Sequence, residues 1–226
     1  MKFNKKKVFV SALAISLVAI ISMGSIAWFT AQDSVENRFN VADSETTPAD
    51  KLFSVTVYEQ RDTNFDGDFN EAGDVEYTED GLSYSAFLPG DTLSKIAHVK
   101  NTGSYNQYMR AVITVSDADK WIAALGADFV IEDILEGYDA SLWARIDRIG
   151  NGTANTLTYV LYYDGIVAPG QDITVFTGVE IPSELTQADD VAFGKDFTVN
   201  VKAQAVQTEN VGADAYAAFT TVGMAL

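Results

Sequence analysis

The clearest pattern in the chain is a strict alternation of apolar and polar residues over 196–206. Such a period of two is typical of a strand with one buried face and one solvated face. Further β-rich segments are predicted over 52–59, 93–100, 107–115, 142–149, 157–163 and 172–181, between loops rich in Gly, Asn, Asp and Pro. Seven or more strands with few helices predict a mainly β protein, an antiparallel β-sandwich.

One short helix interrupts this pattern after the strand that ends at residue 115. Ser116 is placed to cap its first turn, with Asp119 as the capping-box partner, and the apolar stripe that follows is Trp121, Ile122 and Leu125. A weaker helical pattern covers 128–135. We therefore expect 116–140 to be a helical insertion at one end of the sandwich, with the stripe serving as core.

Two Pro-Gly pairs each stand directly before a predicted strand, Pro89-Gly90 and Pro169-Gly170. Proline fixes φ, and glycine accepts the positive φ of a type II turn. Each pair therefore predicts a turn that begins a strand.

The N-terminus has the order of a secretory signal. Four lysines (Lys2, Lys5, Lys6 and Lys7) precede the uncharged apolar run Val8–Met23, and small residues follow it. Ser25 and Ala27 fit the −3 and −1 positions, which predicts a signal peptide over 1–27 and cleavage between Ala27 and Trp28. The alternative is an uncleaved anchor, but a run of about 16 residues is short against the ~20 that span a bilayer.

Composition limits the partners. The 226 residues include 15 Lys and Arg against 32 Asp and Glu, a formal charge of −17, and cleavage after Ala27 would remove four lysines and no acid. Nucleic-acid binding relies on a basic surface, so neither DNA nor RNA is an expected partner. With no cysteine, an exported form gains no disulfides, so we expect its stability to come from the core of a single domain over 51–226.

The loop from Asp62 to Asp74 resembles an EF-hand calcium loop in its spacing of oxygen side chains. Residues at its positions 1, 3, 5 and 9 are Asp, Asn, Asp and Asn, with glycine at position 6. Gly73 replaces the usual bidentate Glu at position 12, so Asp74 or Glu71 would have to substitute. We expect a weak structural calcium site at this connection, or a solvated turn without an ion; the candidate ligands are Asp62, Asn64, Asp66, Asp68, Asn70 and Asp74.

Candidate catalytic groups are few. His98 is the only histidine, so the two or three imidazoles of most catalytic zinc sites cannot be assembled. It is interpreted as a surface or edge residue of a strand. The tyrosines that could form a carbohydrate platform are interpreted as packing instead: Tyr105, Tyr108, Tyr159, Tyr162 and Tyr163.

Three stretches resemble the TasA/camelysin family of biofilm matrix proteins. GSIAWFTAQDSVENRFNV (24–41) is similar to an export signal handled by the SipW-type signal peptidase, together with its downstream flank. FLPGDTLSKIAHVKNTGS (87–104) resembles the family's Pro-Gly-Asp strand and Asn-x-Gly turn, and FTVNVKAQAVQ (197–207) resembles its last strand.

The resemblance implies a jelly-roll-like sandwich that polymerises head to tail into extracellular fibres, a structural protein and not an enzyme. Residues 28–50 are then an assembly segment whose strand, within Trp28–Val41, is donated to the next copy. One face of that strand would carry Val35, Asn37, Phe39 and Val41. The implied partners are further copies of the chain and a signal peptidase, and the membrane is met only through the signal peptide.

Three alternatives stay open. The N-terminal segment could be an ordinary first strand of its own domain, or a free tail, which would make the chain a monomeric, calcium-stabilised adhesion module. The camelysin branch also suggests a secreted metalloprotease, against which the single histidine stands.

Overall fold

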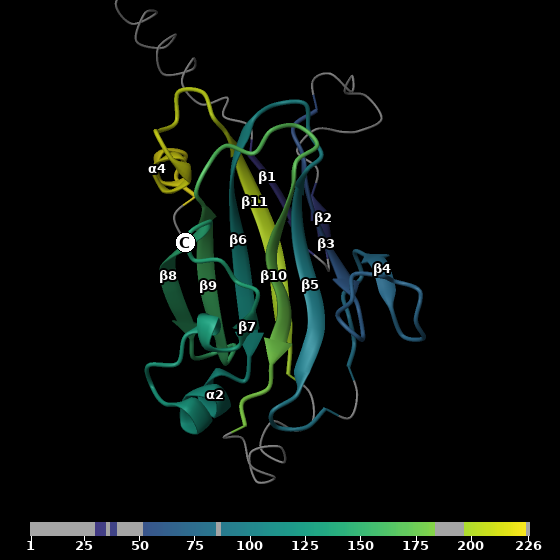
Figure 1. Ribbon diagram of the computed structural model, residues 1–226. Coiled ribbons are helices and arrows are strands. Elements are labelled where there is room, and N and C mark those ends of the chain that lie inside the picture. The colour runs from purple at the N-terminus through teal and green to yellow at the C-terminus, as the bar shows by residue number, and fades with distance from the viewer. Residues whose placement is uncertain (1–29, 35–36, 40–51, 85–86, 184–196, 225–226) are drawn as a thin grey trace, which may run out of the picture.

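Two antiparallel sheets face each other in the computed structural model, which describes residues 30–34, 37–39, 52–84, 87–183 and 197–224 (Figure 1). One sheet consists, in spatial order, of β2 (Asn37–Phe39), β1 (Thr30–Ser34), β11 (Val199–Gln207), β6 (Gln107–Ser116), β9 (Thr156–Tyr163) and β8 (Trp143–Asn151). The other consists of β4 (Val75–Thr78), β3 (Val55–Arg61), β5 (Thr92–Asn101), β10 (Asp172–Glu180) and β7 (Leu135–Glu136).

The mainly β sandwich predicted from the sequence is confirmed. Each of the seven expected strands is present, with ends shifted by three residues at most. Strands β4 and β7 were not predicted; they are short and lie at the two edges of the five-stranded sheet. The jelly-roll form of the sandwich stays a prediction.

The alternation in β11 has the expected consequence. Val201, Ala203 and Ala205 are fully buried between the sheets, whereas Lys202 on the opposite face is exposed. The largest buried side chains of this core are contributed by both sheets and by the insertion: Trp121, Trp143, Tyr159, Phe129 and Phe176.

The two Pro-Gly turns are also confirmed. Gly90 has φ 88° and Gly170 has φ 78°, and each turn directly precedes a strand, β5 and β10 respectively. The two strands pair with each other, and each turn bonds to the far end of its partner strand: Gly90 N–H donates to Ile181 O at 2.7 Å, and Gly170 N–H donates to Asn101 O at 2.9 Å. The repeated turn therefore closes both ends of one strand pair.

The predicted helix is present as α2 (Ala118–Leu125), and Trp121 is fully buried, as expected of core. The predicted cap was wrong. Ser116 Oγ bonds to the Asp117 carboxylate instead of the helix, and Asn155, from the turn between β8 and β9, caps α2: its backbone oxygen accepts from Ala118 N–H and its Oδ1 from Asp119 N–H. The weaker helical pattern gives only a short 3-10 turn, η2 (Ile131–Asp133), before β7.

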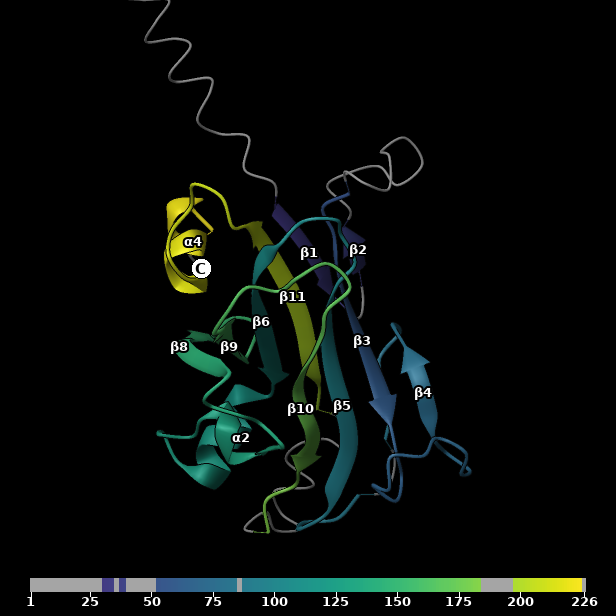
Figure 2. The ribbon, with the colours of Figure 1, turned by 45° about the horizontal axis from the view of Figure 1, so that its top comes forward.

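A C-terminal helix that was not predicted, α4 (Ala215–Thr221), packs on the outer face of the six-stranded sheet (Figure 2). It covers a second apolar cluster that includes Tyr108, Val112, Val160, Tyr162, Val206 and Phe219. Arg110, only 1% exposed, lies under this cover, where its guanidinium is 4.3 Å from the Phe219 ring centroid and donates to Met224 O at 2.7 Å. Arg110 thus holds α4 and Met224 against the six-stranded sheet.

Candidate functional site

The N-terminal strands lie at the edge of the six-stranded sheet. All five residues of β1 pair with β11, from Thr30 opposite Val206 to Ser34 opposite Lys202, and β2 pairs with β1 on its other side. Removing both strands would leave β11, a nine-residue strand, at the sheet edge. Such an edge offers unpaired backbone groups to any extended segment of matching pattern.

Only part of the predicted assembly strand falls in the described residues. Asn37 and Phe39 lie in β2, next to β1 and not next to β11. Val35 and Val41, and the predicted cleavage site at Ala27 and Trp28, lie outside the described residues. Direct pairing with β11 therefore involves 30–34, a few residues before the face expected from the sequence.

The acidic loop between β3 and β4 is organised by Asp62, which is only 2% exposed. Its Oδ1 accepts from Phe65 N–H at 2.7 Å and from Asn64 N–H at 3.3 Å, and its Oδ2 accepts from Gly67 N–H at 2.7 Å. Phe65 (φ 60°) and Gly67 (φ 84°) take left-handed conformations to make this turn. The predicted first ligand is therefore a buried scaffold group of the loop.

A second carboxylate closes the loop at its other end. Asp74 Oδ1 accepts from the backbone and hydroxyl groups of Thr63, and its Oδ2 accepts from Glu71 N–H, all within 2.8 Å. These bonds, above all that from the Thr63 N–H, lower the pKa of Asp74 to about 2. A side-chain hydrogen bond with the same Asp74 carboxylate raises the pKa of the Glu71 carboxyl group.

The remaining candidate ligands bond to their neighbours in the loop. Asp66 accepts from Asp68 N–H at 2.8 Å and from Asn64 Nδ2 at 3.1 Å, and Asn70 donates to Asp68. Among the residues that the structure describes, no three acidic or histidine side chains converge as a metal site would require. Oxygen side chains suit calcium, but the carboxylates of the loop already accept hydrogen bonds from its backbone N–H groups without an ion. Calcium binding therefore stays a prediction.

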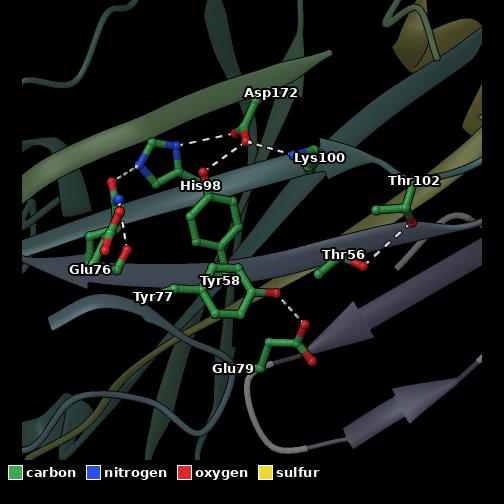
Figure 3. A network of polar contacts seen from close by, with 10 residues as sticks. Thr56, Tyr58, Glu76, Tyr77, Glu79, His98, Lys100, Thr102 and Asp172 are labelled. Atoms are coloured by element: carbon green, nitrogen blue, oxygen red, sulfur yellow. Dashed lines mark hydrogen bonds and ion pairs between the residues drawn. The ribbon is translucent and has the colours of Figure 1, made fainter. Parts of the chain in front are cut away.

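His98 lies on the outer face of the five-stranded sheet, in a polar network that links four strands (Figure 3). Its Nδ1 is 3.2 Å from Asp172 Oδ1, and its Nε2 is 2.8 Å from Gln60 Oε1. The ring stacks on Tyr58 at 4.6 Å between centroids, and Tyr58 stacks in turn on Tyr77 at 4.7 Å. Strand β5 is an inner strand of the sheet, so His98 is a face residue and not an edge residue.

The network orients the ring of His98. Gln60 Nε2 donates to Glu76 O at 2.8 Å, which turns Gln60 Oε1 toward the ring, so that the imidazole Nε2–H donates to this oxygen. Burial lowers the pKa of His98, and the nearby Asp172 offsets this only in part. Burial also raises the pKa of Tyr58, whose hydroxyl donates to Asp172 at 2.7 Å. The two ring nitrogens thus face the Asp172 carboxylate and the Gln60 amide oxygen, both of which are hydrogen-bond acceptors.

The tyrosines considered as a carbohydrate platform do not form one surface. Tyr108, Tyr159 and Tyr162 are buried in the two cores, Tyr163 is partly buried against Trp143, and Tyr105 is exposed by itself on a loop. The interpretation as packing is right for the first four.

Charged groups that the sequence analysis did not single out lie inside the protein. Arg110 is buried under α4, and Lys95 forms an ion pair with Glu59 between the sheets, where the two residues are 6% and 0% exposed. The burial of Glu59 could be predicted in part from the strand pattern, because Glu59 lies on the same face of its strand as the buried Val55 and Val57.

Comparisons with protein-family models, curated proteins and solved structures found no significant match. In the described part of the chain, no helix is both long and apolar enough to cross a bilayer.

Proposed function

We propose that this chain is an exported structural subunit that polymerises into extracellular biofilm matrix fibres, each copy donating its N-terminal strand to the sheet edge of the next. The observation that carries the proposal is the position of β1: five residues near the N-terminus, paired along β11 at the edge of the sheet. A strand that binds by backbone pairing to an otherwise open edge is the element that copies can exchange.

Exchange preserves the local energetics. A neighbour's β1 would make the same five register pairs with β11 as the chain's own β1, so the closed and exchanged forms differ mainly in the entropy of association. A strand that is donated onward without reciprocal exchange makes a heterologous contact, and such contacts build open filaments when the rotation between copies does not close a ring.

The main alternative is a monomeric adhesion module, which the pairing of β1 with β11 of its own chain favours. Truncation separates the two functions. The exported protein without residues 28–41 should stay folded, because the principal core is built from residues after 52, and should form no fibres. Fibres of normal appearance from the truncated protein would rule out the donor strand.

A point substitution gives a finer test. Asp33→Pro, in the middle of β1, removes a backbone donor and stiffens the strand, and should abolish or strongly slow fibre growth seen by negative-stain microscopy. Asp43→Pro is the matched control. It lies four residues after the end of β2 in the sequence, and it should polymerise as the wild type does.

A further inference from the structure

Strand β10 ends and β11 begins at the same end of the sandwich (Figure 1). A cavity of about 300 Å³ lies between the sheets at this end. Apolar side chains of both sheets and of the adjoining loops line part of it, among them Phe87, Leu93, Val179, Phe197 and Val199, next to polar residues such as Tyr84 and Asn200. The Phe87 and Phe197 rings meet edge to face at 5.5 Å. The volume is at the lower end of the range of small-molecule sites.

One end of the cavity is charged. Glu59 and Lys95 both line it, and Lys95 Nζ donates to Glu59 Oε1. Both residues are more than nine-tenths buried. An ion pair removed from water stabilises a fold less than apolar packing of the same volume, so stability alone does not account for it.

The hydrogen bonding of this ion pair is incomplete. Among the described residues, no group donates a hydrogen bond to the buried Glu59 Oε2. A carboxylate oxygen left without a partner in a dry site costs free energy, and such atoms in native proteins usually have a ligand or an ordered water. Lys95 Nζ carries three N–H donors, of which Glu59 Oε1 uses one.

The charges at this end select the polar group of a ligand. An anion would face the Glu59 carboxylate, and a cation would face the Lys95 ammonium, so each meets a like charge in a site of low dielectric. A hydroxyl group meets neither obstacle. It can donate to Glu59 Oε2 and at the same time accept from Lys95 Nζ.

We infer that this cavity binds a neutral small molecule with an apolar body and a terminal hydroxyl group, with the hydroxyl on the Glu59–Lys95 pair and the body against the aromatic and aliphatic wall. This function is independent of fibre assembly, because the cavity residues include none of the residues of β1 or β2.

The test compares two probes that share one body. Equilibrium dialysis of the full chain at pH 7 measures saturable binding of 4-methylphenol, and of 4-methylanisole, in which a methyl ether replaces the hydroxyl. Because the ether cannot donate to Glu59 Oε2, we expect it to bind at least tenfold more weakly, a difference of about 1.4 kcal/mol. Equal binding of the two probes to the wild type would overturn the inference.

Two variants address the polar end and the wall separately. Replacing Glu59 and Lys95 together by Met keeps the volume and removes both charges, and should make the two probes bind equally. Leu93→Trp should fill the cavity and remove binding of both. Lys100→Met, on the outer face of the same strand, is the control and should retain the wild-type preference.

Circular dichroism of each variant checks that the sandwich is folded. A preference for the phenol that survives in the double-Met variant would show that the pair plays no part and would overturn the assignment. If the folded wild type binds neither probe saturably at millimolar concentration, water is the only partner left for Glu59 Oε2, and this result also contradicts the inferred ligand site.

Discussion

Replacing Asp62 by Ala should destabilise the protein even when no calcium is present. Three backbone N–H groups donate to this buried carboxylate, and they hold the loop between β3 and β4. Hydrogen bonds to a charged group contribute about 1.5–3 kcal/mol each, but the freed donors can return to water in an exposed loop. We therefore expect a net loss of about 2–3 kcal/mol.

Urea unfolding in the presence of a chelator measures this loss. With a slope of about 2 kcal/mol per molar urea, the midpoint should fall by roughly 1 M. Asp62→Asn keeps acceptor oxygen without the charge and should lose about half as much. Asp68→Ala is the matched control, since that carboxylate is exposed and bonds mainly to Asn70 Nδ2, and its free energy of unfolding should stay within about 0.5 kcal/mol of the wild type.

The two interpretations of the loop differ in this experiment. If Asp62 were only a free ligand awaiting calcium, its removal would leave the chelated protein unchanged and would reduce stability only when calcium is added. An unchanged midpoint for Asp62→Ala in chelator would therefore refute the scaffold role that the hydrogen bonds assign to it.

Three further predictions concern calcium, pH and the helix cap. Millimolar calcium on a site of about 10⁻⁴ M should add roughly 1.4 kcal/mol to the free energy of unfolding, measured by thermal melts, and Asp66→Ala should remove that gain; an equal response of both proteins would show that the loop is not the site. Because burial lowers the pKa of His98, the unfolded chain takes up a proton at this residue before the folded protein does as the pH falls. The free energy of unfolding should therefore decline as the pH falls through about 6.5, and it should decline less in His98→Gln. Parallel curves of unfolding free energy against pH for the two proteins would contradict this. Glycine tolerates the φ of 52° at position 155 but loses the side-chain cap of α2, so Asn155→Gly should lower the free energy of unfolding in urea by about 1 kcal/mol. Asn155→Ala should lower it further, because alanine is strained at that φ. Equal losses for the two variants would contradict the contribution of this backbone strain.

The sequence was most informative where one physical requirement dominated. In β11 the alternation reflects burial of one face, and in the Pro-Gly turns the backbone conformation permits few other residues, so both were predicted correctly. The helix α2 was placed correctly, but its cap comes from Asn155, which is distant in sequence, and a local capping pattern cannot reveal a tertiary cap.

Other features depend on contacts that the local sequence does not encode. Helix α4 is short and apolar on the face that meets the sheet, and its place became evident only with Arg110 and the second apolar cluster beneath it. The spacing of the loop predicts Asp62 as a calcium ligand, but it does not reveal that the position of Asp62, directly after β3, buries its side chain. The Glu59–Lys95 pair required the packing of two strands to be seen.

The central claim is that β1 pairs with β11 of a neighbouring copy in the assembled state. The chain has no cysteine, so new thiols report one contact each. Ser34 and Lys202 are directly opposite each other in the β1–β11 register, which suits a disulfide, while Asn200 is two residues farther along β11 and serves as the control position.

The decisive measurement mixes two single variants, Ser34→Cys and Lys202→Cys, under fibre-forming conditions, oxidises them mildly and separates the products on a non-reducing gel, with peptide mapping of the linked residues. Strand donation predicts a covalent dimer joined between residue 34 of one copy and residue 202 of the next, and little such dimer from the pair Ser34→Cys and Asn200→Cys. Fibres that yield no 34–202 link between copies, while the double variant Ser34→Cys/Lys202→Cys closes its disulfide within single chains, would contradict the account.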